Sequence, residues 1–204
     1  MNKIDFSYAS KVEHNFAQRL IIKSIESITG KKKLESLYKN YSLDSKNPKT
    51  FWSDILDRMN IRVINKSQKK LVIPNKGSLI IIANHPFGVA DGVTLAWIAS
   101  RIDPNFRVIA NGVLRKEPSL NPNILPIEFQ PGRQAIKQNV ETRRQSIQTL
   151  KSGGVVALFP AGAVSWSQRP SAPVEDDAWK PLVSRLIKAS NCDVLPIRFE
   201  GANS

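Results

Sequence analysis

The sequence predicts an α/β fold with a mostly parallel central sheet flanked by helices, preceded by an N-terminal helical region. Two observations lead to this prediction. From about residue 61 onward, short apolar runs alternate with longer segments of helical apolar spacing. Such alternation is typical of a parallel sheet with helices on its faces. The second observation is that 204 residues with an apolar fraction of 41% are enough for a buried core.

Residues 1–60 are predicted to form an amphipathic helical region. Val12, Phe16 and Leu20 recur every four residues, and Gly30 is a suitable end for this first helix. Two further helices are expected around residues 34–41 and 51–59. The region is basic, because residues 1–70 carry 15 basic and 7 acidic side chains. Its apolar stripe can lie in a membrane interface or pack on the α/β domain, and the sequence leaves both open.

Residues 61–204 form the predicted α/β domain. Helices are expected at 91–101, 133–151 and 176–190, the second ending at Gly153-Gly154. The chain stops directly after a core strand, so we expect the domain to be shortened at its C-terminus. The expected strands are Ile61–Ile64, Leu71–Ile73, Leu79–Ala83, Phe106–Ala110, Ile124–Phe129, Val155–Phe159 and Val194–Phe199.

Composition narrows the classes of partner and cofactor. The net charge of +13 suits a nucleic acid, an anionic membrane, or an acidic protein or phosphorylated substrate. With Cys192 as the single cysteine and two histidines, we expect neither a disulfide nor a metal site. The first twenty residues lack the apolar core of a secretion signal, and no segment has the apolar length of a membrane span. The chain is expected to be globular and intracellular.

The segment after the Leu79–Ala83 strand carries the strongest chemical signal. It reads Asn84-His85-Pro86-Phe87-Gly88, with Asp91-Gly92 following. The strand delivers His85 to the carboxyl edge of the sheet, where sites of such folds lie. Across the Pro/Gly turn Asp91 can bond one ring nitrogen of His85, which leaves the other nitrogen as a general base. The alternative is that His85 only ends a strand and Asp91 only caps a helix.

Two further turns follow predicted strands. Phe159-Pro160-Ala161-Gly162 repeats the design of a strand followed by a Pro/Gly turn, whose amides can approach a ligand closely. Pro131-Gly132-Arg133 precedes the predicted helix 133–151. A helix N-terminus attracts anions, and Arg133 would add a bidentate phosphate contact. Taken alone, each turn is equally compatible with an ordinary structural role.

Taken in order, these segments resemble the glycerolipid acyltransferase superfamily of lysophosphatidic acid acyltransferases and their relatives. The resemblance covers roughly residues 25–204 and is nearest to the hemolysin-like branch, which includes lyso-ornithine-lipid acyltransferases. It rests on Asn84 to Gly92, Phe159 to Ser165, and two Leu-Pro-Ile strands at 125–127 and 195–197. It implies a glycerol-3-phosphate acyltransferase-like fold, peripheral on the cytoplasmic face of the membrane.

The resemblance also implies the reaction and its residues. A fatty acyl group would pass from acyl-carrier protein or coenzyme A, as co-substrate, to the hydroxyl of a lysolipid, with no further cofactor. His85 would be the base and Asp91 its partner. The chain departs from the widespread pattern in having five residues between them and Ala161 in place of a glutamate. The implied substrate-binding residues are Asn84, Pro86, Phe87, Gly88, Arg133, Pro160, Ala161 and Gly162.

Other classes fit the sequence less well. A nucleic-acid-binding module agrees with the charge, but no zinc-finger spacing or Arg-Gly-Gly tract occurs. A serine hydrolase and a P-loop enzyme both lack their signature motifs. The alternative that stays open is a catalytically inactive, lipid-binding family member. We therefore expect a lysolipid acyltransferase of membrane lipid synthesis that binds no nucleic acid.

Overall fold

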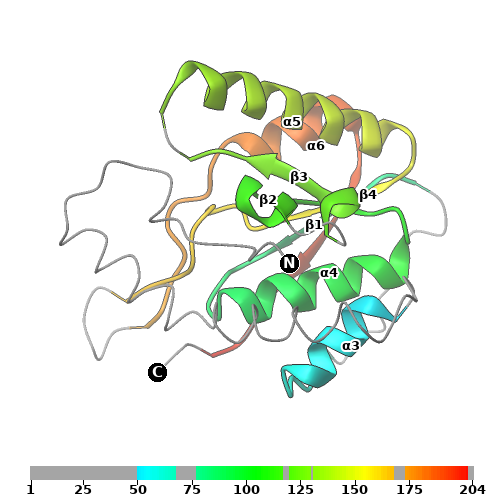
Figure 1. The fold of residues 1–204 in the computed structure, drawn as a ribbon, viewed down its shortest axis with the longest axis vertical. Coiled ribbons are helices and arrows are strands. Elements are labelled where there is room, and N and C mark those ends of the chain that lie inside the picture. The colour runs from blue at the N-terminus through cyan, green and yellow to red at the C-terminus, as the bar shows by residue number, and fades with distance from the viewer. Residues whose placement is uncertain (1–49, 68–76, 117–119, 130, 168–172, 202–204) are drawn as a thin grey trace, which may run out of the picture.

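The computed structural model describes residues 50–67, 77–116, 120–129, 131–167 and 173–201. The predicted helices before residue 50 and the predicted strand Leu71–Ile73 lie outside these ranges. Within them the chain forms one five-stranded sheet with α-helices on both faces (Figure 1). The strands are β1 (Leu79–Ala83), β2 (Arg107–Asn111), β3 (Ile124–Ile127), β4 (Val155–Leu158) and β5 (Asp193–Ile197).

All neighbouring strands of this sheet pair in parallel, in the order β3-β2-β4-β1-β5. The predicted fold class is thereby confirmed. Strand β1 pairs with β4 on one side and β5 on the other, and all five of its residues are buried. A strand covered on both faces needs an uninterrupted apolar run, which explains the sequence Leu-Ile-Ile-Ile-Ala. The carboxyl end of β1 consequently lies inside the sheet rather than at its border.

Alternate side chains of the sheet enter two separate core layers. Leu79 and Ile81 pack with the helices α3 (Phe51–Arg58) and α4 (Val89–Ile102). Ile80 and Ile82 pack on the other face, where α5 (Arg133–Lys151) and α6 (Leu182–Ser190) lie (Figure 1). Within the part of the chain that is described, no helix is long and apolar enough to cross a bilayer.

Several predicted elements match closely and two do not. The helix 133–151 and the strand Leu79–Ala83 have the predicted bounds, and the helix after His85 starts at Val89 instead of Asp91. The prediction of a strand at Ile61–Ile64 is wrong: these described residues form no strand, and Ile64 is 67% exposed. Two short 3-10 helices, η2 (Gly112–Lys116) and η3 (Asn121–Asn123), were not anticipated.

The last predicted helix is also shorter than expected. It begins at Leu182 and not at residue 176. Pro181 is tolerated at the start of a helix but not in its interior, and residues 173–181 contact another part of the chain instead. That segment runs in extended and irregular form past the end of β1. Glu175 pairs with Trp166 in an isolated antiparallel bridge, and the Lys180 amide donates to the Pro160 carbonyl. The segment thus lies against the turn that follows β4.

Candidate active site

The chain turns sharply between β1 and α4, and this turn places His85 at the sheet edge. Gly88 adopts a φ of +64°, a conformation that other residues rarely take. Helix α4 therefore begins at Val89, and Asp91 lies in the first turn of this helix. A carboxylate there is favoured by the positive end of the helix dipole. Local backbone geometry therefore directs both side chains toward the same point.

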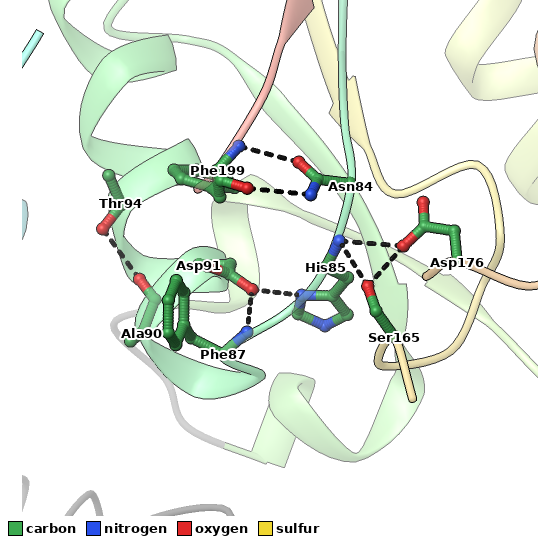
Figure 2. A network of polar contacts seen from close by, with 9 residues as sticks. All are labelled: Asn84, His85, Phe87, Ala90, Asp91, Thr94, Ser165, Asp176 and Phe199. Carbon is green, nitrogen blue, oxygen red and sulfur yellow. Dashed lines mark hydrogen bonds and ion pairs between the residues drawn. The ribbon is translucent and has the colours of Figure 1, made fainter. Parts of the chain in front are cut away.

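His85 and Asp91 are in direct contact. The Nδ1 atom of His85 lies 3.1 Å from Oδ2 of Asp91, which is only 2% exposed. The same carboxylate oxygen accepts the backbone N–H of Phe87 at 2.6 Å. Because an ionised carboxylate can only accept, we assign the proton of the neutral ring to Nδ1. The other ring nitrogen, Nε2, is then an acceptor and points away from Asp91 in Figure 2.

Further contacts hold the ring and backbone of His85. Its imidazole stacks on Phe159, with ring centroids 3.8 Å apart and planes 13° from parallel. Its backbone N–H donates to Oδ1 of Asp176 at 3.1 Å and lies 3.3 Å from Oγ of Ser165. Its carbonyl accepts the Ser165 amide at 2.9 Å. The site therefore joins β1, the turn after β4 and the 173–181 segment.

Asp176 and Ser165 are site residues for which sequence reasoning gave no role. Asp176 is the first residue of the predicted helix 176–190, and 91 residues separate it from His85. Nothing in the spacing of the sequence could have indicated this contact. Ser165 lies in the Phe159 to Ser165 segment that carried the resemblance, but its buried hydroxyl contact with Asp176 becomes visible only in the folded chain.

Asn84 holds two strand ends together. Its Nδ2 donates to the Phe199 carbonyl at 2.9 Å, and its Oδ1 accepts the Phe199 amide at 2.7 Å (Figure 2). Phe199 lies just past the end of β5, so the side chain continues the β1–β5 pairing beyond the sheet. This gives Asn84 a structural function, and its predicted role in substrate binding stays a prediction.

The turn after β4 lies beside Lys180 and Phe129. Gly162 has a φ of +74°, and a Cβ atom there would lie 3.1 Å from both Lys180 Nζ and Phe129 Cε1. Ala161 is buried and, as an alanine, offers no polar group to a ligand. Pro160 connects the turn to the Lys180 amide through its carbonyl. Substrate binding by these three residues stays a prediction, as does substrate binding by Pro86, Phe87 and Gly88.

Arg133 is not brought next to His85. It is exposed at the first position of α5, which follows β3 at the border of the sheet. Strands β2 and β4 lie between β3 and β1, so three inter-strand spacings of ~4.8 Å separate the two strand ends. The ends of β3 and β1 are therefore about 14 Å apart along the carboxyl edge of the sheet. The role of Arg133 in substrate binding stays a prediction.

Comparison with known proteins gives the family of this chain. A lyso-glycine lipid O-acyltransferase of Phocaeicola vulgatus is 26% identical over 195 residues, which cover 94% of this chain and 65% of the relative. A lyso-glycine lipid O-acyltransferase of Bacteroides thetaiotaomicron is 32% identical over 136 residues, covering 65% of this chain and 46% of the relative. The chain thus spans less than two thirds of the length of both relatives. The profile of the family described as "Acyltransferase" matches residues 40–204, and the chain belongs to that acyltransferase family.

Proposed function

We propose that this protein is an O-acyltransferase that moves a fatty acyl group from a thioester to the hydroxyl of a lysolipid. The observation that carries the proposal is the pairing of His85 Nδ1 with the buried carboxylate of Asp91 at the carboxyl edge of the sheet. Family membership supports the acyl-transfer chemistry. The names of the two relatives favour an acceptor with an amino-acid headgroup, as in a lyso-glycine lipid. The donor is acyl-carrier protein or coenzyme A.

The geometry suggests how the reaction proceeds. Nε2 of His85 accepts the proton of the acceptor hydroxyl while the oxygen attacks the thioester carbonyl carbon. The tetrahedral intermediate then collapses, the C–S bond breaks, and the leaving thiolate takes the proton from Nε2. The products are the new ester and a free thiol. Asp91 keeps the proton on Nδ1 and stabilises the imidazolium that forms in between.

Amide groups near His85 are candidates to stabilise the oxyanion of the intermediate. The Phe87 amide is unsuitable, because it already donates to Asp91. The first amides of α4 remain, since the first four N–H groups of a helix have no partner within it. Removing one oxyanion donor typically costs about 10²–10³ in rate. The start of α4 is therefore the proposed position of the thioester oxygen.

We also propose that the carboxyl edge faces an anionic bilayer, on the cytoplasmic side. Trp166 and Trp179 are about half exposed, and they flank the site because Trp166 follows Ser165 and Trp179 donates to Asp176 at 3.1 Å. Phe129 is 47% exposed, and Lys180 Nζ lies over its ring, 5.0 Å from the ring centroid. Tryptophan and basic side chains favour the lipid–water interface. This orientation would let a lysolipid reach His85 without leaving the membrane.

Vesicle binding tests this orientation. Sedimentation with phosphatidylglycerol vesicles should recover less of the Trp166→Ala and Trp179→Ala variants than of the wild type. Trp97→Ala is the matched control, because Trp97 lies on α4 and packs against the core. Equal binding by all four proteins would contradict the orientation.

Acyl transfer itself is tested with labelled acyl-carrier protein and acyl-coenzyme A against a panel of lysolipids. The panel contains lyso-glycine lipid, lyso-ornithine lipid and lysophosphatidic acid. His85→Ala should lower the rate by at least about 10²–10⁴-fold, the usual contribution of a general base. His14→Ala, the other histidine of the chain, is the control and should stay active. A wild type that binds these lipids but transfers nothing would favour the inactive lipid-binding alternative, with which the apolar Ala161 also agrees.

A further inference from the structure

We propose that Asp176 is a positioning residue that fixes the backbone of His85 for acyl transfer. The expected effect on kcat rests on the proposed function, whereas the positioning of His85 by Asp176 does not. Oδ1 of Asp176 accepts two hydrogen bonds, from the His85 amide at 3.1 Å and from the Ser165 hydroxyl at 2.5 Å (Figure 2). Its other oxygen, Oδ2, accepts the indole N–H of Trp179 at 3.1 Å. The carboxylate is thus fixed by three donors.

The position of His85 explains why such a carboxylate is needed. Strand β1 ends at Ala83, so His85 lies beyond the last residue that is paired with the neighbouring strands. A backbone amide past the end of a parallel strand has no sheet partner, so the His85 amide depends on side-chain acceptors, which are Oδ1 of Asp176 at 3.1 Å and the more distant Oγ of Ser165 at 3.3 Å. The bond to Asp176 is charge-assisted, and such bonds are stronger than those between neutral groups.

Two carboxylates therefore hold His85 at two different atoms. Asp91 binds the ring at Nδ1 and Asp176 binds the backbone nitrogen, from opposite sides in Figure 2. Ser165 completes the arrangement, because its amide donates to the His85 carbonyl while its hydroxyl donates to Asp176. Fixing both ends leaves Nε2 one direction in which to point. The turn after β4 and the 173–181 segment are thereby coupled to the base.

The kinetic test uses two substitutions at Asp176 and a neighbouring control. In Asp176→Ala both hydrogen bonds from His85 and Ser165 lose their acceptor, and kcat should fall by roughly 10²-fold, the scale of a misplaced reacting group, with KM little changed. Asp176→Asn keeps an oxygen in the position of Oδ1 and should recover most of kcat. The control is Asp177→Ala, which removes an exposed carboxylate whose Oδ1 accepts the Trp166 indole N–H at 2.8 Å.

A second measurement needs no substrate. The chain has only two histidines, so the ring ¹H–¹⁵N signals of His85 can be assigned with the His14→Ala variant. Asp176→Ala should shift and broaden the His85 ring signals, whereas Asp176→Asn and Asp177→Ala should leave them near their wild-type positions. If Asp176→Ala does not fold, Ser165→Ala serves instead and should move the same signals by a smaller amount, because the Asp176–amide bond stays.

The outcomes separate this inference from the proposed function. If the wild type transfers no acyl group but the ring signals change as stated, the proposed function fails and the positioning by Asp176 stands. If folded Asp176→Ala keeps both the wild-type ring signals and the wild-type kcat, the positioning role is overturned. A fall in kcat that Asp177→Ala reproduces equally would also overturn it, because any loss of charge in that segment would then suffice.

Discussion

Replacing Asn84 by alanine tests whether this residue serves the fold or the substrate. Its side chain makes two hydrogen bonds to the backbone of Phe199, of 2.9 and 2.7 Å, in partly buried surroundings. Each such bond contributes on the order of 1 kcal/mol to stability. Asn84→Ala should therefore lower the free energy of unfolding by about 2 kcal/mol. For a protein of this size, that loss corresponds to a melting temperature lower by roughly 4–8 °C.

The assay is thermal unfolding followed by circular dichroism, together with KM for the lysolipid. A structural Asn84 predicts the loss of stability, whereas a substrate-binding Asn84 predicts a raised KM and an unchanged melting temperature. Asn84→Asp sharpens the test, since it keeps an acceptor for the Phe199 amide but places a second oxygen against the Phe199 carbonyl. It should be at least as unstable as Asn84→Ala at neutral pH. Exposed Asn105→Ala is the control.

An unchanged melting temperature in Asn84→Ala would refute this reasoning. It would mean that water replaces both hydrogen bonds without loss, and that the pairing of β1 and β5 does not depend on the Asn84 side chain. The substrate-binding role would then be the better explanation for this position.

Three further predictions concern other parts of the molecule. Gly162→Ala should lower the free energy of unfolding in urea by about 1–2 kcal/mol, because φ is +74° there and the new Cβ would crowd Phe129. Asp91→Asn should lower kcat by up to about 10⁴-fold, because a neutral amide no longer fixes the proton on Nδ1; full activity would contradict the pairing. The Arg144 hydrogen bond lowers the pKa of Glu141 from 4.5 to about 2. The stabilisation by the ionised Glu141 is present above pH 4.5 and is lost as the pH falls toward 2. The melting temperature of Glu141→Gln should therefore fall less than that of the wild type on acidification over this range. The difference should be small, because the pair is exposed.

Local patterns account for the elements that the sequence predicts well. The helix 133–151 is long, periodic and ended by two glycines, and its bounds match those of α5. The run Leu79–Ala83 is entirely apolar, which only a doubly covered strand requires, and it is β1. The shorter segment Ile61–Ile64 is apolar except for Arg62 and forms no strand, because strand formation depends on a pairing partner that composition does not reveal.

The fold class, the family resemblance and the possible contact of His85 with Asp91 are predicted from the sequence alone, because each rests on patterns within short stretches of the chain. The contacts that support this pair are seen only in the folded chain. Asp176 lies 91 residues from His85, and Phe199 lies 115 residues from Asn84. Parallel strands bring distant segments to one edge of a sheet, and which loop crosses that edge is set by packing rather than by local spacing. The residues that hold the base in place could therefore be identified only in the folded chain.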